Sequence, residues 1–247
     1  MKGMIRFGAA AVAVMTLAGM SGCSRAADGG QTTADEATGK SSGQTSGGGA
    51  SQNSGRDIGS GVAGEKLANS LDEYIDMFIS NQFEPASDYE KSVMERAKAD
   101  GGVTAADYED AWSTYKSCML DKGYKEIVLI KYPNGIYEEA VHYSGTDSQE
   151  EKYDADQASC FGNVNIVAEI YAVQQGNGSL LSNRDEAIVD CLRRNDLVPK
   201  DYTAEQYARE RADGELSYDA QDMGVRGCQA ANNSFVGFAD DPVEKLW

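Results

Sequence analysis

The stretch YEDAWSTYKSCMLDKGY, Tyr108–Tyr124, decides the fold that the sequence predicts. Its apolar residues recur every three or four positions, which places them on one face of an α-helix. They are Tyr108, Ala111, Trp112, Tyr115, Cys118 and Met119. Thr104 is the expected N-cap, and Gly123 stands where a left-handed C-terminal residue is expected. This helix turns Cys118 inward, where its thiol can pair with a cysteine of a later helix.

The same periodicity predicts helices on both sides of this stretch. Upstream, we expect one helix over Glu65–Gln82 and another from Ser87 to about Ala99, opened by the capping-box pattern Ser87-Asp88-Tyr89-Glu90. Downstream, the predicted helices are Ser148–Gln175, Asn183–Arg194, Thr203–Asp213 and Tyr218–Asn232. The tail from Pro242 to Trp247 has no clear assignment.

A β-hairpin is predicted among the helices, because Asn134-Gly135 separates the apolar-rich runs Glu126–Tyr132 and Ile136–Tyr143. An isolated hairpin is only marginally stable in water, so it must pack on the helices or extend a sheet. Its aromatic residues, Tyr132, Tyr137 and Tyr143, are expected to pack across the strands, with a ligand-stacking face as the alternative. The predicted fold class is therefore mainly α with a minor β component: a disulfide-stapled helical domain with one hairpin.

Residues 1–22 have the form of an export signal. Lys2 and Arg6 precede the apolar core Gly8–Met20, which is too short to span a bilayer. Met20-Ser21-Gly22-Cys23 follows, and here the sequence resembles the lipobox of bacterial lipoproteins, with Met20 in place of the usual leucine. The resemblance implies cleavage before Cys23 and diacylation of that cysteine. Two acyl chains suffice for stable anchoring in a lipid bilayer. A secreted protein with an incidental cysteine is the alternative.

The region from Cys23 to Gly64 is predicted to be a disordered tether. Gly, Ser, Thr, Ala, Gln and Asp dominate it, and it contains no aromatic residue, so it cannot bury enough surface to offset its chain entropy. A flexible coil of this length reaches roughly 35 Å. The sequence thus divides into a signal peptide over 1–22, a lipid-anchored tether over 23–64 and an acidic helical domain over 65–247.

The helical domain contains four cysteines, Cys118, Cys160, Cys191 and Cys228. An even number in an exported protein indicates two disulfides, for which three pairings are possible. We favour Cys118–Cys160 and Cys191–Cys228 because the chain looks faintly duplicated. Asp-Ala lies before the second cysteine of each pair, at Asp154 and Asp219. The two-fold repeat is weak, and common helical composition explains it about as well.

No pattern indicates a metal, a cofactor or a catalytic residue. The turn Asp100-Gly101-Gly102 resembles the later half of an EF-hand loop, but the first and third ligand positions would fall on Arg96 and Lys98. Positive charges there oppose calcium binding, so a helix–turn–helix corner is the better interpretation. His142 is the only histidine, which weighs against Ser-His-Asp catalysis and multi-histidine zinc sites. Cys-x-x-Cys does not occur.

The charge of the chain restricts its partners. Forty acidic residues against 22 basic ones give a formal net charge of −18. Such a field repels the phosphates of nucleic acids and anionic lipid head groups, so we expect no nucleic-acid partner. A plain solvated surface is the simplest interpretation of the acidity, and cations or basic partners are the alternative.

Part of the helical domain resembles uncharacterised actinobacterial surface lipoproteins and secreted proteins. The resemblance covers roughly residues 86–160 and rests on a helix–turn–helix that ends in a Cys-Met and Gly-aromatic pattern. The matching residues are Val93-Met94-Glu95-Arg96-Ala97, Asp100-Gly101, Val103-Thr104, Tyr108, Cys118-Met119 and Gly123-Tyr124. It carries over no catalytic residue. Together with the lipobox, the long Ser/Gly tether and the acidic domain, it indicates a lipid-anchored protein on the extracytoplasmic face of a Gram-positive type of cell membrane.

Three functions stay open at this level. The first is a non-enzymatic interaction module that binds a protein, a peptide or an envelope component, such as an accessory to a transporter. The second is a small-solute-binding lipoprotein, although the strand–helix alternation of two-lobed binding proteins is absent. The third is a carboxylate-based cell-wall hydrolase, for which Glu138-Glu139 and Asp240-Asp241 are pairs no better than chance. We expect the first, and no enzyme.

Overall fold

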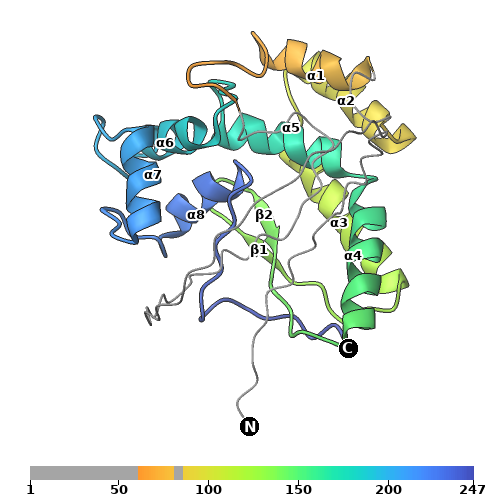
Figure 1. Ribbon diagram of the computed structural model, residues 1–247. Helices are drawn as coiled ribbons and strands as arrows, with labels where there is room; N and C mark the ends of the chain where they lie inside the picture. Colours follow the sequence, from red (N-terminus) through yellow and green to blue (C-terminus); the bar gives the residue numbers. More distant parts are fainter. Residues whose placement is uncertain (1–60, 81–85) are drawn as a thin grey trace, which may run out of the picture.

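The computed structural model describes residues 61–80 and 86–247. This part of the chain is mainly helical, with eight helices and a two-stranded antiparallel hairpin (Figure 1). The helices are α1 Leu71–Ile79, α2 Asp88–Asp100, α3 Ala105–Asp121, α4 Asp147–Phe161, α5 Asn165–Gly176, α6 Arg184–Arg194, α7 Ala204–Asp213 and α8 Met223–Ala230. The strands are β1 Leu129–Lys131 and β2 Tyr137–Glu139. The predicted signal peptide, Cys23 and nearly all of the tether lie outside the described residues.

Helix α5 forms the centre of the domain. Its side chains are buried on most of its circumference, and it packs against α1, α2, α3, α6 and α8. In Figure 1 it runs across the middle, with α1 and α2 above it and the hairpin below. A helix that is buried on most of its circumference is stable only when neighbours cover those sides. The surrounding helices are therefore arranged about α5.

The buried apolar side chains form two hydrophobic cores. The larger one joins α1 to α5 with the hairpin, and its largest fully buried side chains include Tyr74, Tyr108, Tyr115 and Phe78. The smaller one is formed within α6, α7 and α8. Gly176 marks where α8 meets α5, because a Cβ atom there would lie 2.3 Å from the Cβ of Ala231. Only glycine lets the end of α8 approach the end of α5 this closely.

The prediction for the central stretch is confirmed. The Thr104 hydroxyl accepts a hydrogen bond from the Asp107 amide at 3.1 Å and caps α3. Trp112 and Tyr115 are buried, and the ring of Tyr108 stacks on that of Tyr171 with centroids 4.2 Å apart. Gly123, just beyond the helix, has the positive φ of 101° that its position required.

The predicted helix over Glu65–Gln82 is wrong at its start. Lys66 forms an antiparallel bridge with Leu181 instead, and Ser70 caps α1 by accepting from the Glu73 amide at 3.1 Å. Leu67 is buried although it precedes the helix, because its amide donates to the Leu180 carbonyl at 2.8 Å and holds this segment against residues 180–182. The apolar periodicity therefore starts before the capping serine. Residues 61–64, assigned to the tether, also belong to the domain: the Gly64 amide donates to Glu186 of α6 at 2.8 Å.

The prediction of a single long helix over Ser148–Gln175 is also wrong, since α4 ends at Phe161 and a separate helix, α5, begins at Asn165. The physical reason is a partner far away in sequence. Glu90 accepts from the Ile166 amide at 3.0 Å, and the Ser87 hydroxyl donates to the Asn163 carbonyl at 3.1 Å. The capping box of α2 thus also satisfies the first turn of α5. The break allows α5 to change direction and enter the core.

Other boundaries are shorter than predicted. Helix α8 begins at Met223 instead of Tyr218, because Asp222 accepts from the amides of Gly224 and Val225 as its N-cap. Each strand keeps only three residues, with Ile130 opposite Glu138. Helices α2, α6 and α7 match their predicted ranges to within one residue, and the Ser87–Glu90 capping box is present.

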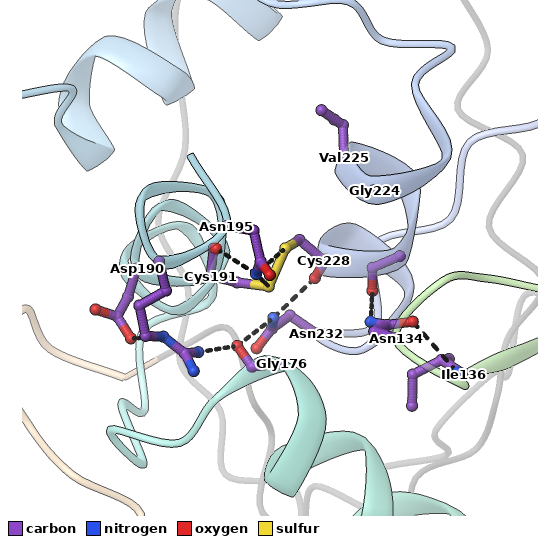
Figure 2. Close-up of a disulfide and its surroundings, with 12 residues drawn as sticks. Asn134, Ile136, Gly176, Asp190, Cys191, Asn195, Gly224, Val225, Cys228 and Asn232 are labelled. Atoms are coloured by element: carbon purple, nitrogen blue, oxygen red, sulfur yellow. Dashed lines mark hydrogen bonds and ion pairs between the residues drawn. A yellow bond between two sulfur atoms is a disulfide. The ribbon is translucent and has the colours of Figure 1, made fainter. Parts of the chain in front are cut away.

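The favoured disulfide pairing is found: Cys118 is bonded to Cys160, and Cys191 to Cys228. Figure 2 shows the second bridge between α6 and α8, where the side-chain amide of Asn195 donates toward both sulfur atoms. The first bridge encloses the hairpin and most of α4, whereas the second encloses α7. The predicted internal repeat stays a prediction. Within the described ranges, no helix is both long and apolar enough to cross a membrane.

Candidate functional site

The most unusual site in the described domain lies beside the hairpin, where a partly buried and a fully buried carboxylate meet. Glu139 of β2 accepts hydrogen bonds from the Tyr153 hydroxyl at 2.8 Å and from the Gln157 amide nitrogen at 3.1 Å, both on α4. The hydroxyl of Tyr115, on α3, is a third donor. Three elements therefore position this one carboxylate. The name carboxylate cluster is used below for Glu139, its donors Tyr115, Tyr153 and Gln157, and the neighbouring Glu244.

Glu244 comes from the tail, which the sequence left unassigned. Its backbone pairs in parallel with His142: the Glu244 amide donates to the Val141 carbonyl at 2.8 Å, and the Tyr143 amide donates to the Glu244 carbonyl at 3.3 Å. The side chain has no exposed surface. Its Oε1 accepts from the Val128 amide at 2.5 Å, while its Oε2 has no hydrogen-bond partner among the described residues. A buried, half-satisfied carboxylate is costly when it is ionised.

Burial determines the protonation of this cluster. It raises the pKa of Glu244 to about 9, with the charge of Glu139 as the second cause. Burial also raises the pKa of Glu139, against the lowering effect of its donors, Tyr115 first. The folded form thus binds the Glu244 proton more tightly than the unfolded chain does. The resulting stabilisation is fully present below the ordinary pKa of 4.5 and is lost as the pH rises through about 9.

Aromatic side chains form a partly exposed rim next to the cluster, where the labelled C-terminus lies at the foot of α4 in Figure 1. The Trp247 indole N–H donates to the Tyr143 carbonyl at 3.0 Å, and its ring packs edge-on against Tyr124 and His142. The His142 ring lies 2.9 Å from a carboxylate oxygen of Glu150. Tyr143 keeps 51% of its surface exposed. We call Tyr124, His142, Tyr143 and Trp247 the aromatic rim.

A second buried polar network lies on the other side of the hairpin. Arg226 of α8 donates to both oxygens of Asp241, at 2.7 and 2.9 Å, and to the Tyr132 hydroxyl at 3.2 Å. Tyr132 in turn donates to Glu138, whose pKa is raised by burial. The guanidinium also lies over the rings of Tyr132 and Phe238. This network joins α8, the hairpin and the tail.

The structure separates the residues that the sequence had paired. Glu138 and Glu139 are neighbours on β2 but enter the two different networks, while Asp241 binds Arg226 and Asp240 is exposed. Of the three hairpin tyrosines, Tyr132 is buried in the Arg226 network and Tyr143 belongs to the aromatic rim. Tyr137 stacks on Tyr108 of α3 with centroids 5.8 Å apart, and Lys131, its partner on the opposite strand, lies over its ring at 5.2 Å.

The EF-hand-like corner is explained by ion pairs. Asp107, at the position of the last ligand, pairs with Arg96 at 2.5 Å, and Lys98 pairs with Asp76 of α1. Gly101 caps α2 in the left-handed conformation. Within the described residues, no group of three or more His, Cys, Asp or Glu side chains is placed to hold a metal ion.

Sequence reasoning missed Glu244 and Arg226, on which these networks depend. Neither carries a local signal, because each is a charged residue in a short segment whose burial comes from distant elements.

The carboxylate cluster can hold a proton inside the domain. Glu139 already accepts from three donors, and Glu244 has no exposed surface, so in this structure neither carboxylate faces solvent where a substrate could reach it. Comparison of the chain with protein-family models, curated proteins and solved structures finds no match.

Proposed function

We propose that this chain is a non-enzymatic, membrane-anchored lipoprotein whose helical domain binds a protein, peptide or envelope component outside the cytoplasm. The observation that supports the proposal is a domain closed by two disulfides, which follows a predicted export signal and the lipobox-like Cys23. Structural disulfides persist in oxidising compartments outside the cytoplasm. Lipid on Cys23 would hold the domain at the extracytoplasmic face of a Gram-positive type of membrane.

The aromatic rim supports the interaction role. Half-exposed Tyr143 lies just before the acidic start of α4, where Asp147, Glu151 and Asp154 are exposed. Aromatic residues supply contact area at protein interfaces, and surrounding acidic residues steer basic partners. A basic protein or peptide surface is therefore the partner that this end of the domain suits best.

Replacing Cys23 by alanine should move the protein from the membrane to the medium. An uncleaved or unacylated chain lacks the two acyl chains that make anchoring stable. The measurement is fractionation of cells that express the wild type, C23A or the control S24A, followed by detergent phase partitioning. S24A should stay with the membrane. Retention of C23A in the detergent phase at the wild-type level would contradict lipid anchoring through Cys23.

A photoreactive amino acid at position 143 should give a reproducible crosslinked adduct in intact cells. The same group at position 209, an exposed site on α7 at the opposite side of Figure 1, is the matched control. The proposal expects the adduct from position 143 only, and expects it to weaken when Asp147 and Glu151 are changed to their amides. Equal labelling from both positions, or no adduct at 143, argues against a binding surface at the rim.

A further inference from the structure

The segment 242–247 closes over the carboxylate cluster and is held by few interactions. Its side-chain anchors are Leu246, which is 2% exposed in the larger core, Trp247 in the aromatic rim, and Glu244. Two backbone hydrogen bonds attach it to residues 141 and 143. An extended segment with so few bonds can open without unfolding the helices beneath it.

Ionisable groups from every neighbouring element face Glu244. Glu139 comes from β2, Tyr115 and Lys116 from α3, Tyr153 from α4, and Glu126 from the chain before β1. Lys116 is the only cation of this set, and its side chain is exposed to solvent at the surface of α3. A second negative charge at Glu244 would therefore meet the charge of Glu139 with little compensation. Like charges at a buried site disfavour joint ionisation.

We propose that the segment 242–247 is a pH-sensitive closure: it is docked while Glu244 carries a proton and is released when Glu244 has lost it. In the released state Glu244 is solvated, and the energy of burying its unsatisfied oxygen is recovered. Release also undoes the contacts of Trp247 with Tyr124, His142 and the Tyr143 carbonyl. The shape of the aromatic rim therefore depends on pH.

Hydrogen exchange of the full chain, purified in detergent, tests this closure. Exchange is followed by mass spectrometry between pH 6 and pH 8.5 and corrected for the intrinsic pH dependence of the chemistry. Release of one proton allows the opening equilibrium to rise up to about tenfold per pH unit. We expect the protection of residues 242–247 to fall at least about tenfold over this range, while that of α5 changes less than about twofold.

Three variants make the result specific. E244Q keeps the acceptor for the Val128 amide but cannot ionise, so its protection should be independent of pH. H142Q removes the imidazole ring that packs on Trp247 beside the bridge to Glu244, and it should keep the full dependence. E139Q removes the facing charge and should make the dependence shallower. If E244Q fails to fold, as judged by circular dichroism, E139Q provides the decisive comparison.

The opposite results would overturn the proposal. The first is a pH dependence of protection in E244Q or E139Q that equals that of the wild type. The second is loss of the pH dependence in H142Q but in neither of the other two variants. The third is wild-type protection that stays constant up to pH 8.5. A parallel loss of protection in α5 would also do so, because it would show global unfolding instead of release of one segment.

Discussion

Replacing Arg226 by methionine should lower the free energy of unfolding by about 3–5 kcal/mol, as is typical when one member of a buried ion pair is removed. Arg226 is 5% exposed and donates to both oxygens of Asp241 and to Tyr132. Methionine fills much of the same volume but leaves Asp241 and Glu138 without their cation. The measurement is urea unfolding at pH 7, followed by circular dichroism.

The comparison variants separate this effect from ordinary loss of a surface charge. K131M removes the exposed ion pair of Lys131 with Glu109 and should change stability by less than about 1 kcal/mol. The double variant R226M/D241N should regain part of the loss, because the stranded carboxylate is gone, and a double-mutant cycle then gives the coupling energy. A loss in R226M no larger than that in K131M would mean that the buried network contributes little.

Removing the Cys191–Cys228 bridge should cost about 2–4 kcal/mol and should act mainly on the smaller core. The two cysteines are 37 residues apart, and the chain-entropy model assigns roughly 4 kcal/mol to a loop of that length. The core of α6, α7 and α8 has few large residues besides Tyr202 and Tyr207, so it depends strongly on the covalent link. The measurement is guanidinium unfolding of C191A/C228A, combined with hydrogen exchange of α7.

Two controls refine the disulfide experiment. C118A/C160A opens a loop of 42 residues, for which chain entropy predicts nearly the same cost, but the larger core should keep its helices protected. The reduced wild type lacks both bonds and retains all sulfur atoms, so it measures the bonds without cavities. If α7 stays fully protected in C191A/C228A, the second core holds itself together and the bridge is not what maintains it.

The features that the sequence predicted correctly depend on neighbouring residues. Thr104, Ser87 and Asn183 each cap the helix they precede, because a capping hydrogen bond spans only three residues. Asn134-Gly135 likewise specifies its own turn, with Gly135 at φ 83°. Such signals do not require knowledge of the rest of the fold.

The features that the sequence did not predict depend on distant contacts. The break between α4 and α5 requires Glu90, which is 76 residues before Ile166. The first turn of α1 was displaced by pairing of Lys66 with Leu181. Glu139 and Glu244 are brought together by the tail, which pairs with His142 in the segment after β2. Hydrophobic periodicity contains no information about such pairings, so the cysteines were the only long-range contacts that could be inferred.

The place where the chain enters the domain has a mechanical consequence. Residues 65–67 run antiparallel to 180–182, with the Leu67 amide donating to Leu180 at 2.8 Å and the Ser182 amide to Glu65 at 2.9 Å. In a domain held by its amino-terminal side, tension from the anchor reaches this pair of hydrogen bonds and the Gly64–Glu186 contact before it reaches any helix. These contacts with residues 180–182 and Glu186 would therefore resist the force first, and they lie away from the aromatic rim. If the domain is anchored as proposed, force from its amino-terminal side would leave the aromatic rim undisturbed until that junction gives way.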